Sequence, residues 1–239
     1  FQNFNVYNGS YDVNWVYLAS GNNWLIAGTA ADEYYPRFDG SATRVVYVSD
    51  EYGSPDIFIN HYSGADKRLV IYSPAVDTMP SFSHDGSKLV FVSDRTGNAE
   101  IFLSNSDGSG QTQLTSAPGT DVEPDWSVDG TRIVWAQRSG NYATLMVMNA
   151  DGSGQHAIST PLLYAGRPMW SPDGKTIAFQ MDANGDGWLD LATIQADGTQ
   201  LTPILLAQNV DYHFEYWMGS WSSTGKKIFF TKVNFVFDD

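Results

Sequence analysis

Oxygen-bearing side chains alternate with other residues in one short stretch, residues 182 to 190, which reads DANGDGWLD. Asp182, Asn184, Asp186 and Asp190 occupy its positions 1, 3, 5 and 9, with a glycine at position 6. A hard cation such as Ca²⁺ takes about six to eight oxygen ligands, and a glycine lets the chain turn sharply enough to supply several from neighbouring positions. With the carbonyl oxygen of Trp188 as a further ligand, the stretch is predicted to bind Ca²⁺.

The flanking acids of this stretch recur elsewhere in the chain. Asp182 matches Asp94, two repeats earlier, and Asp190 matches Glu100 once a two-residue insertion is allowed. The insertion places further oxygen-bearing residues between two acids at the spacing of cation ligands. Asp, Asn and Gly are also ordinary hairpin residues, which explains part of the pattern. No glutamate stands at position 12, so a structural site is expected rather than a sensor.

Two further acidic pairs repeat these flanking positions without the insertion. They are Asp50 with Asp56 and Asp94 with Glu100. We expect them to cap their hairpins or to pair with a neighbour such as Arg95, and a weak second cation site is the alternative.

A third set of acids precedes a repeated proline by three residues. Glu33, Asp77 and Asp121 belong to it, and Ala165 and Tyr216 break the series. At the mouth of a central channel they could form a partial negative ring that holds a cation or a basic segment. Solvated loop acids are the alternative.

Other chemistry has weaker support. Asp211, His213 and Glu215 alternate as on a strand and could ligate a transition metal, although a surface histidine near carboxylates is common. There is no G-x-S-x-G elbow, and the chain has 4 histidines. Carboxylates such as Asp77 and Asp121 leave glycoside cleavage open, and an aromatic content of 14% leaves sugar stacking open.

These residues are carried by a repeat. Phe82, Trp126 and Trp170 are spaced by 44 residues, and three glycines share that spacing: Gly86, Gly130 and Gly174. Residues 80 to 115 predict strands around Phe82, at 89 to 92, at 101 to 103 and around Leu114, separated by turn residues. Four strands in a period of about 40 to 45 residues predict an all-β propeller of four-stranded antiparallel blades.

The repeat divides the whole chain, residues 1 to 239, into blades of one propeller domain. Whole blades are predicted at about 36–78, 80–122, 124–166 and 168–215, with a fifth blade split between residues 11–29 and 216–233. A front half at the end and a back half at the start complete one another, which closes a ring without an open edge. Six blades are the alternative count. Residues 1 to 10 match no part of the repeat but are apolar enough that we expect them to pair with another segment.

The motifs resemble a known family. Pro-x-Trp-Ser-x-Asp-Gly, then Ser-Asp-Arg-x-Gly-Asn-x-Glu-Ile, then Asp-Gly-Ser-Gly-Gln-x-x-Leu-Thr are similar to the β-propeller repeats of the TolB type, over about residues 36 to 232. The resemblance implies a periplasmic or secreted protein that binds other proteins through a propeller face. The loop at 182 to 190 resembles the DxDxDGxxD calcium loops of integrin-type propellers, with Asn184 in place of one aspartate.

Composition narrows the classes of partner. Lys and Arg number 13 against 27 Asp and Glu, a formal net charge of -14, which argues against nucleic acid or an anionic membrane as partner. No apolar run approaches the roughly 20 residues of a membrane span. A start at Phe1 favours maturation after export, so we expect an extracellular or periplasmic location. The predicted function is a non-enzymatic, calcium-stabilised module for protein binding or self-association, including filaments, with a glycan-binding or glycan-cleaving propeller as the alternative.

Overall fold

The computed structural model describes residues 2–5, 10–17, 22–205 and 213–235, and every regular element in these ranges is a β-strand. The chain forms two compact units, residues 1–117 and 118–239. Unit 1 holds β1 (Gln2–Asn5), β2 (Ser10–Tyr17), β3 (Asn22–Ala27), β4 (Glu33–Phe38), β5 (Arg44–Ser49), β6 (Asp56–His61), β7 (Arg68–Ile71), β8 (Asp77–Phe82), β9 (Lys88–Ser93), β10 (Glu100–Asn105) and β11 (Thr112–Gln113). Unit 2 holds β12 (Thr120–Trp126), β13 (Arg132–Ser139), β14 (Tyr142–Asn149), β15 (His156–Ala157), β16 (Ala165–Trp170), β17 (Thr176–Met181), β18 (Asp190–Gln195), β19 (Thr202–Leu205), β20 (His213–Trp221) and β21 (Ile228–Phe235). None of the described residues forms a helix long and apolar enough to cross a lipid bilayer.

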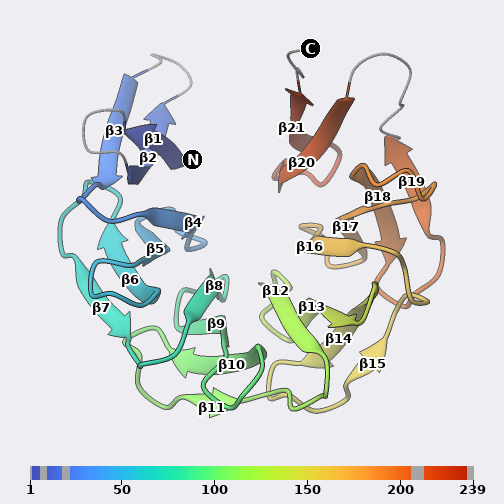
Figure 1. Cartoon of the computed structure of the whole chain (residues 1–239), viewed down its shortest axis with the longest axis horizontal. Coiled ribbons are helices and arrows are strands. Elements are labelled where there is room, and N and C mark those ends of the chain that lie inside the picture. Colours follow the sequence, from blue (N-terminus) through green and yellow to red (C-terminus); the bar gives the residue numbers. More distant parts are fainter. Residues whose placement is uncertain (1, 6–9, 18–21, 206–212, 236–239) are drawn as a thin grey trace. The chain divides into compact units, whose positions relative to one another are not determined.

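Four four-stranded antiparallel sheets confirm the predicted blade. They are β4–β7, β8–β11, β12–β15 and β16–β19, each with its strands side by side in chain order (Figure 1). The prediction of five blades is wrong for the described residues, which contain four. The segments expected to form a split fifth blade instead lie in two separate sheets, the three-stranded β1-β2-β3 in unit 1 and the two-stranded β20-β21 in unit 2. One reason is that β1, at the unmatched N-terminal segment, itself pairs with β2.

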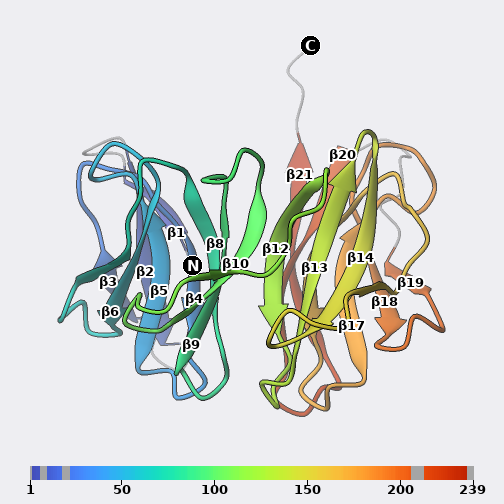
Figure 2. The same cartoon turned by 90° about the horizontal axis from the view of Figure 1, so that it is seen from below.

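The core of each unit forms where the face of one sheet packs on the next. In unit 1, residues of β5 to β7, such as Ile57 and Ile71, contact Phe82 and Phe91 of the following blade, and all are buried. In unit 2, Leu145 and Val147 pack in the same way against Trp170 and Phe179. Figure 2 shows strands along their length, and in unit 2 the successive strands β12, β13 and β14 lie next to one another. A single sheet of four short strands cannot bury both faces, so the repeat stabilises itself by stacking.

Every complete blade carries a bulge in its first strand. The strand register shifts there, between Thr78 and Ser81 for example. The residue before the repeated proline has a left-handed backbone conformation in all four blades: Tyr35 (φ 52°), Met79 (φ 49°), Glu123 (φ 57°) and Arg167 (φ 48°). Non-glycine residues rarely take this conformation, and the bulge re-aims the end of the strand that carries Glu33, Asp77 and Asp121.

A glycine in the hairpin between the third and fourth strands sets how closely neighbouring blades approach. An added Cβ on Gly108 would lie 1.8 Å from the carbonyl oxygen of Val70, and one on Gly198 would lie 2.8 Å from that of Ile158. At the equivalent Gly64 the nearest atom, the carbonyl oxygen of Leu25, would be 3.2 Å away. The first two sheets of unit 1 therefore leave more room beside this glycine than the neighbouring sheets leave beside Gly108 and Gly198.

Candidate functional site

The predicted calcium stretch forms the loop between β17 and β18. Glycines with positive φ, Gly185 (77°) and Gly187 (85°), turn the chain there. The Asp182 carboxylate accepts hydrogen bonds from the amides of these two glycines, at 2.7 and 3.1 Å, and Asp186 accepts from the amide of Trp188 at 2.9 Å. The buried Asp190 accepts from the amide of Ala183 at 2.9 Å. The acids of this loop therefore fold inward on its own backbone.

This donor set fits a hard cation in its chemistry, because carboxylate and amide oxygens are the ligands that calcium prefers. Each oxygen that accepts an amide hydrogen retains a second lone pair. However, no three acidic or histidine side chains of the described residues gather closely enough to hold a metal ion. Ca²⁺ binding would thus require Asp182, Asp186 and Asp190 to draw together from the positions seen here.

The three acids predicted for a channel mouth all lie at the start of a first strand, and all are fully buried. Glu33 accepts hydrogen bonds from the Thr29 hydroxyl at 2.7 Å and from Ser49 at 3.3 Å. Burial raises the pKa of Glu33 above its ordinary value, and the charge of Asp12 adds to this, while the hydrogen bonds oppose it. Glu33 belongs to unit 1 and is held entirely by groups of that unit.

Asp77, also in unit 1, pairs with Arg95, whose Nη2 lies 2.7 Å from Oδ1. Its second oxygen accepts the Ser73 hydroxyl at 2.7 Å. Asp121, in unit 2, accepts from the Gln137 side chain at 3.1 Å, and its Oδ2 has no hydrogen-bond partner among the described residues. Neither carboxylate is exposed to solvent, so this conformation does not favour the pair as glycosidase groups.

The repeated acidic pairs hold loops and strand ends. Asp50 accepts the amide of Asp32, and Asp94 accepts that of Val76, each at 2.9 Å. The buried Glu100 accepts the Asn98 side chain at 2.7 Å and the Thr115 hydroxyl at 2.6 Å. Arg95, which we expected beside one of these acids, pairs with Asp77 instead.

Asp56 differs from the other repeated acids. Its side chain is fully buried, and neither oxygen has a hydrogen bond of ordinary geometry in the described part of the chain. Burial raises its pKa, the nearby charge of Asp77 raises it further, and the backbone of Ser73 offsets this in part. The predicted transition-metal set falls at the start of β20. Asp211 lies outside the described residues, and His213 and Glu215 are described only as positions of that strand.

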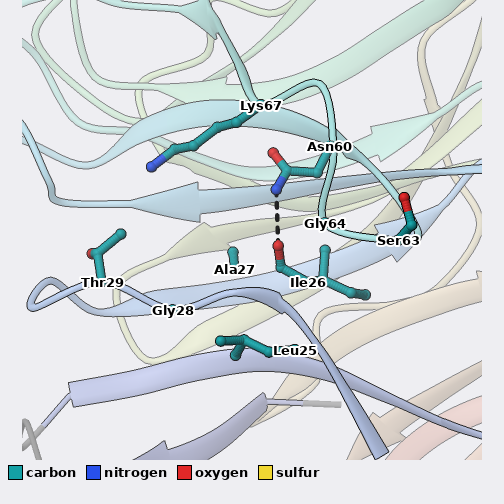
Figure 3. A pocket seen from close by; sticks show the side chains of 9 residues that line it. All are labelled: Leu25, Ile26, Ala27, Gly28, Thr29, Asn60, Ser63, Gly64 and Lys67. Carbon is teal, nitrogen blue, oxygen red and sulfur yellow. Dashed lines mark hydrogen bonds between the residues drawn. The ribbon is translucent and has the colours of Figure 1, made fainter.

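A hollow of about 340 Å³ lies between the first two sheets of unit 1 (Figure 3). The side chain of Asn60 closes one side by donating to the carbonyl oxygen of Ile26 at 2.9 Å. Lys67 reaches over the hollow and also pairs with Glu51. Its lining residues are Leu25, Ile26, Ala27, Gly28, Thr29, Asn60, Ser63, Gly64 and Lys67. The surface of the hollow is mixed, with backbone groups, apolar side chains, the Asn60 amide, the hydroxyls of Thr29 and Ser63, and the Lys67 ammonium.

A more apolar hollow of about 290 Å³ lies in unit 2, where β18 and β19 meet the β20-β21 sheet. We call it the β21 groove. It is lined by Leu191, Thr193, Ile204, Leu205, Trp221, Lys226, Lys227, Ile228 and Phe230. Ile204 is 46% exposed and Phe230 43%, and the adjacent Phe229 is 57% exposed. Apolar side chains exposed together in this way are typical of protein-binding surfaces.

The comparisons with known proteins agree with the repeat. A family model described as the TolB beta propeller domain matches residues 5–224. A putative TolB from Agrobacterium tumefaciens is 17% identical, with a TM-score of 0.75 over 93% of this chain and 78% of that chain. TolB from Acinetobacter baumannii is 17% identical, with a TM-score of 0.74 over 94% of this chain and 59% of that one.

An oligogalacturonate lyase in complex with manganese is also similar, at 12% identity and a TM-score of 0.66, over 93% of this chain and 66% of the lyase. At such identities the likeness shows the fold alone. No curated protein matches the sequence. The family match covers most of the chain and agrees with the four antiparallel blades, so the chain belongs to the TolB β-propeller domain family.

Proposed function

We propose that this chain is a protein-interaction module of an exported protein, and that the β21 groove is its binding surface. The observation that carries the proposal is the hollow itself, which Ile204 and Phe230 line with exposed apolar side chains. Family membership supports a protein partner and a location outside the cytoplasm.

The groove suits an extended apolar segment. β21 is the outer strand of its sheet in the described residues, so its backbone can pair with an added strand. Trp221 and Leu205 provide an apolar floor, since both are partly buried against the core cluster of this sheet contact. Lys226 and Lys227 at the rim favour a partner segment that carries acids.

Panning a random-peptide display library on the immobilised protein tests the role. Peptides that alternate apolar and polar residues should be enriched, and their binding should be lost in Phe230→Asp. Tyr72→Asp is the matched control, because Tyr72 is an exposed aromatic of unit 1, at 63%. No enrichment, or equal loss in both variants, would overturn the proposal.

Calcium is the second part of the proposal. The loop at 182 to 190 would hold the ion through Asp182, Asn184, Asp186, Asp190 and the Trp188 carbonyl oxygen. What supports it is the spacing of oxygen-bearing side chains at positions 1, 3, 5 and 9 of the loop and the two glycines of positive φ that shape the turn. The ion would neutralise acids of the loop and fix the β17-β18 hairpin, and so would stabilise the blade rather than contact a partner.

A further inference from the structure

The first sheet of unit 1 contains the third and fourth strands of a blade. Asp12 in β2 lies 44 residues before Asp56, the first residue of the third strand β6. In the complete blade Ser49 of the second strand faces Asp56, and in the first sheet Asn3 of β1 faces Asp12. β1 therefore takes the place of a second strand, in the register that a second strand would have.

β21 in unit 2 is a second strand that has no third strand beside it in the described residues. Ile228 faces Trp221 as Ile177 faces Trp170 in the preceding blade. By the same count Lys232, which faces Tyr216, stands where Ser49 stands in its blade, opposite the acid of the third strand. The edge of β21 that would meet that acid is open in its sheet.

We propose that β1 and β21 are alternative partners for one edge of β2, and that β21 of a second copy replaces β1 to give a head-to-tail assembly. This rests on the proposed interaction role and names the partner as another copy of the chain. The register fixes the pairs: Lys232 of one copy faces Asp12 of the next, and Val233 faces Tyr11. Opposite charges directly across a strand pair stabilise it.

Length also favours the exchange. β1 has 4 residues and β21 has 8, so β21 can form the longer ladder with β2, whose length is 8. Addition of β2 and β3 to β21 would complete a four-stranded blade and cover Phe230 and the β21 groove. Because the pairing is between copies, it must grow with protein concentration.

Disulfide trapping tests the register, and the chain has 0 native cysteines to interfere. Tyr11→Cys with Val233→Cys should give reducible dimers and higher species whose share increases with concentration, and mixing isotope-labelled with unlabelled protein should show that the bonds join different copies. Tyr11→Cys with Phe4→Cys, which face one another across β1 and β2, should lock β1 in place and leave a monomer. Tyr11→Cys with Tyr142→Cys, an exposed site of unit 2, is the control that should not cross-link.

A bond between residues 11 and 233 of the same chain, or no bond at all, would overturn the proposal. Charge reversal gives a second readout without cysteines. Asp12→Lys and Lys232→Asp should each reduce assembly, and an equimolar mixture of the two should restore heterotypic pairs. Both proteins are first checked for folding by circular dichroism, and a folded pair that assembles like the unmodified protein would contradict the register.

Peptide binding by the locked protein distinguishes self-assembly from a general interaction role. If the protein with β1 locked still binds library peptides and Phe230→Asp abolishes this binding, the groove is a binding surface for other proteins even without self-assembly. If neither assembly nor peptide binding is found, the interaction role itself is wrong.

Discussion

The guanidinium of Arg95 lies 2.7 Å from the fully buried carboxylate of Asp77. This ion pair joins the hairpin after β9 to the start of β8, within one blade. The neighbouring Asp56 is also buried, but among the described residues it has no cation partner and no well-formed hydrogen bond. Removing the partner of Asp77 should therefore destabilise the protein, whereas removing the charge of Asp56 should stabilise it.

Arg95→Ala should strongly destabilise unit 1. Removing one partner of a buried pair leaves an uncompensated charge, and we expect the free energy of unfolding to fall by about 3 kcal/mol, since Arg95 keeps part of its side chain exposed. Arg138→Ala is the matched control. Its pair with Glu123 is longer, 3.5 Å, and more exposed, so the loss should be about 1 kcal/mol or less. Urea denaturation measures both, and equal losses would contradict this account.

Asp56→Asn should stabilise the protein at neutral pH. The pKa of Asp56 is raised in the folded chain, so the folded state binds more protons, and its stability falls as the pH rises from the unfolded pKa through the folded one. The amide removes this loss, and each unit of raised pKa corresponds to about 1.4 kcal/mol. Stability should therefore become less dependent on pH above about pH 4.

Asp85→Asn provides the contrast for Asp56. Hydrogen bonds from Ser83 and Ser87 lower the pKa of Asp85 to about 2, so its contribution is present at neutral pH and is lost as the pH falls through that value. This variant should lose stability at neutral pH. A lower unfolding midpoint at pH 7 for Asp56→Asn would refute the assignment of Asp56.

Calcium should raise the melting temperature. An ion that binds the folded state alone stabilises it by about 2.7 kcal/mol at a concentration 100 times its dissociation constant. Asp186→Asn should remove the shift, whereas Asp197→Asn, in the next hairpin of the same blade, should keep it. Differential scanning fluorimetry with and without a chelator measures the effect. No shift, with no metal found by elemental analysis, would exclude the site.

Gly108→Ala should disturb the contact between the second and third sheets of unit 1. The new methyl group would lie 1.8 Å from the carbonyl oxygen of Val70, at a φ of 84°. Gly97→Ala carries a similar backbone strain, at a φ of 113°, with nothing within 4 Å of the added atom. We expect the free energy of unfolding to fall by about 1 kcal/mol in Gly97→Ala, from the backbone alone, and by about 2 kcal/mol more in Gly108→Ala. Equal effects in thermal unfolding would show that the hairpin moves freely.

The sequence by itself determined the blade. Phe82, Trp126 and Trp170 recur every 44 residues between turn glycines, and this period together with the strand pattern predicts a stack of small sheets. Turn chemistry and strand alternation are local properties of the chain, so the sequence can specify them directly. The same local rules predicted the turn at 182 to 190. The number of blades does not follow from local rules, because two segments of the chain could pair with the edge of β2. In the described part of the chain, the N-terminal strand β1 pairs with it, and the C-terminal strand does not.

Only the tertiary structure decided the state of the acids. Glu33 and Asp77 share one place in the repeat, yet Glu33 is held by hydroxyl and amide groups while Asp77 meets a guanidinium. The β21 groove was also absent from the pattern, since Ile204 and Phe230 are far apart in sequence and meet where two sheets pack. Desolvation and charge depend on neighbours brought together by packing, and a repeat in sequence does not specify them.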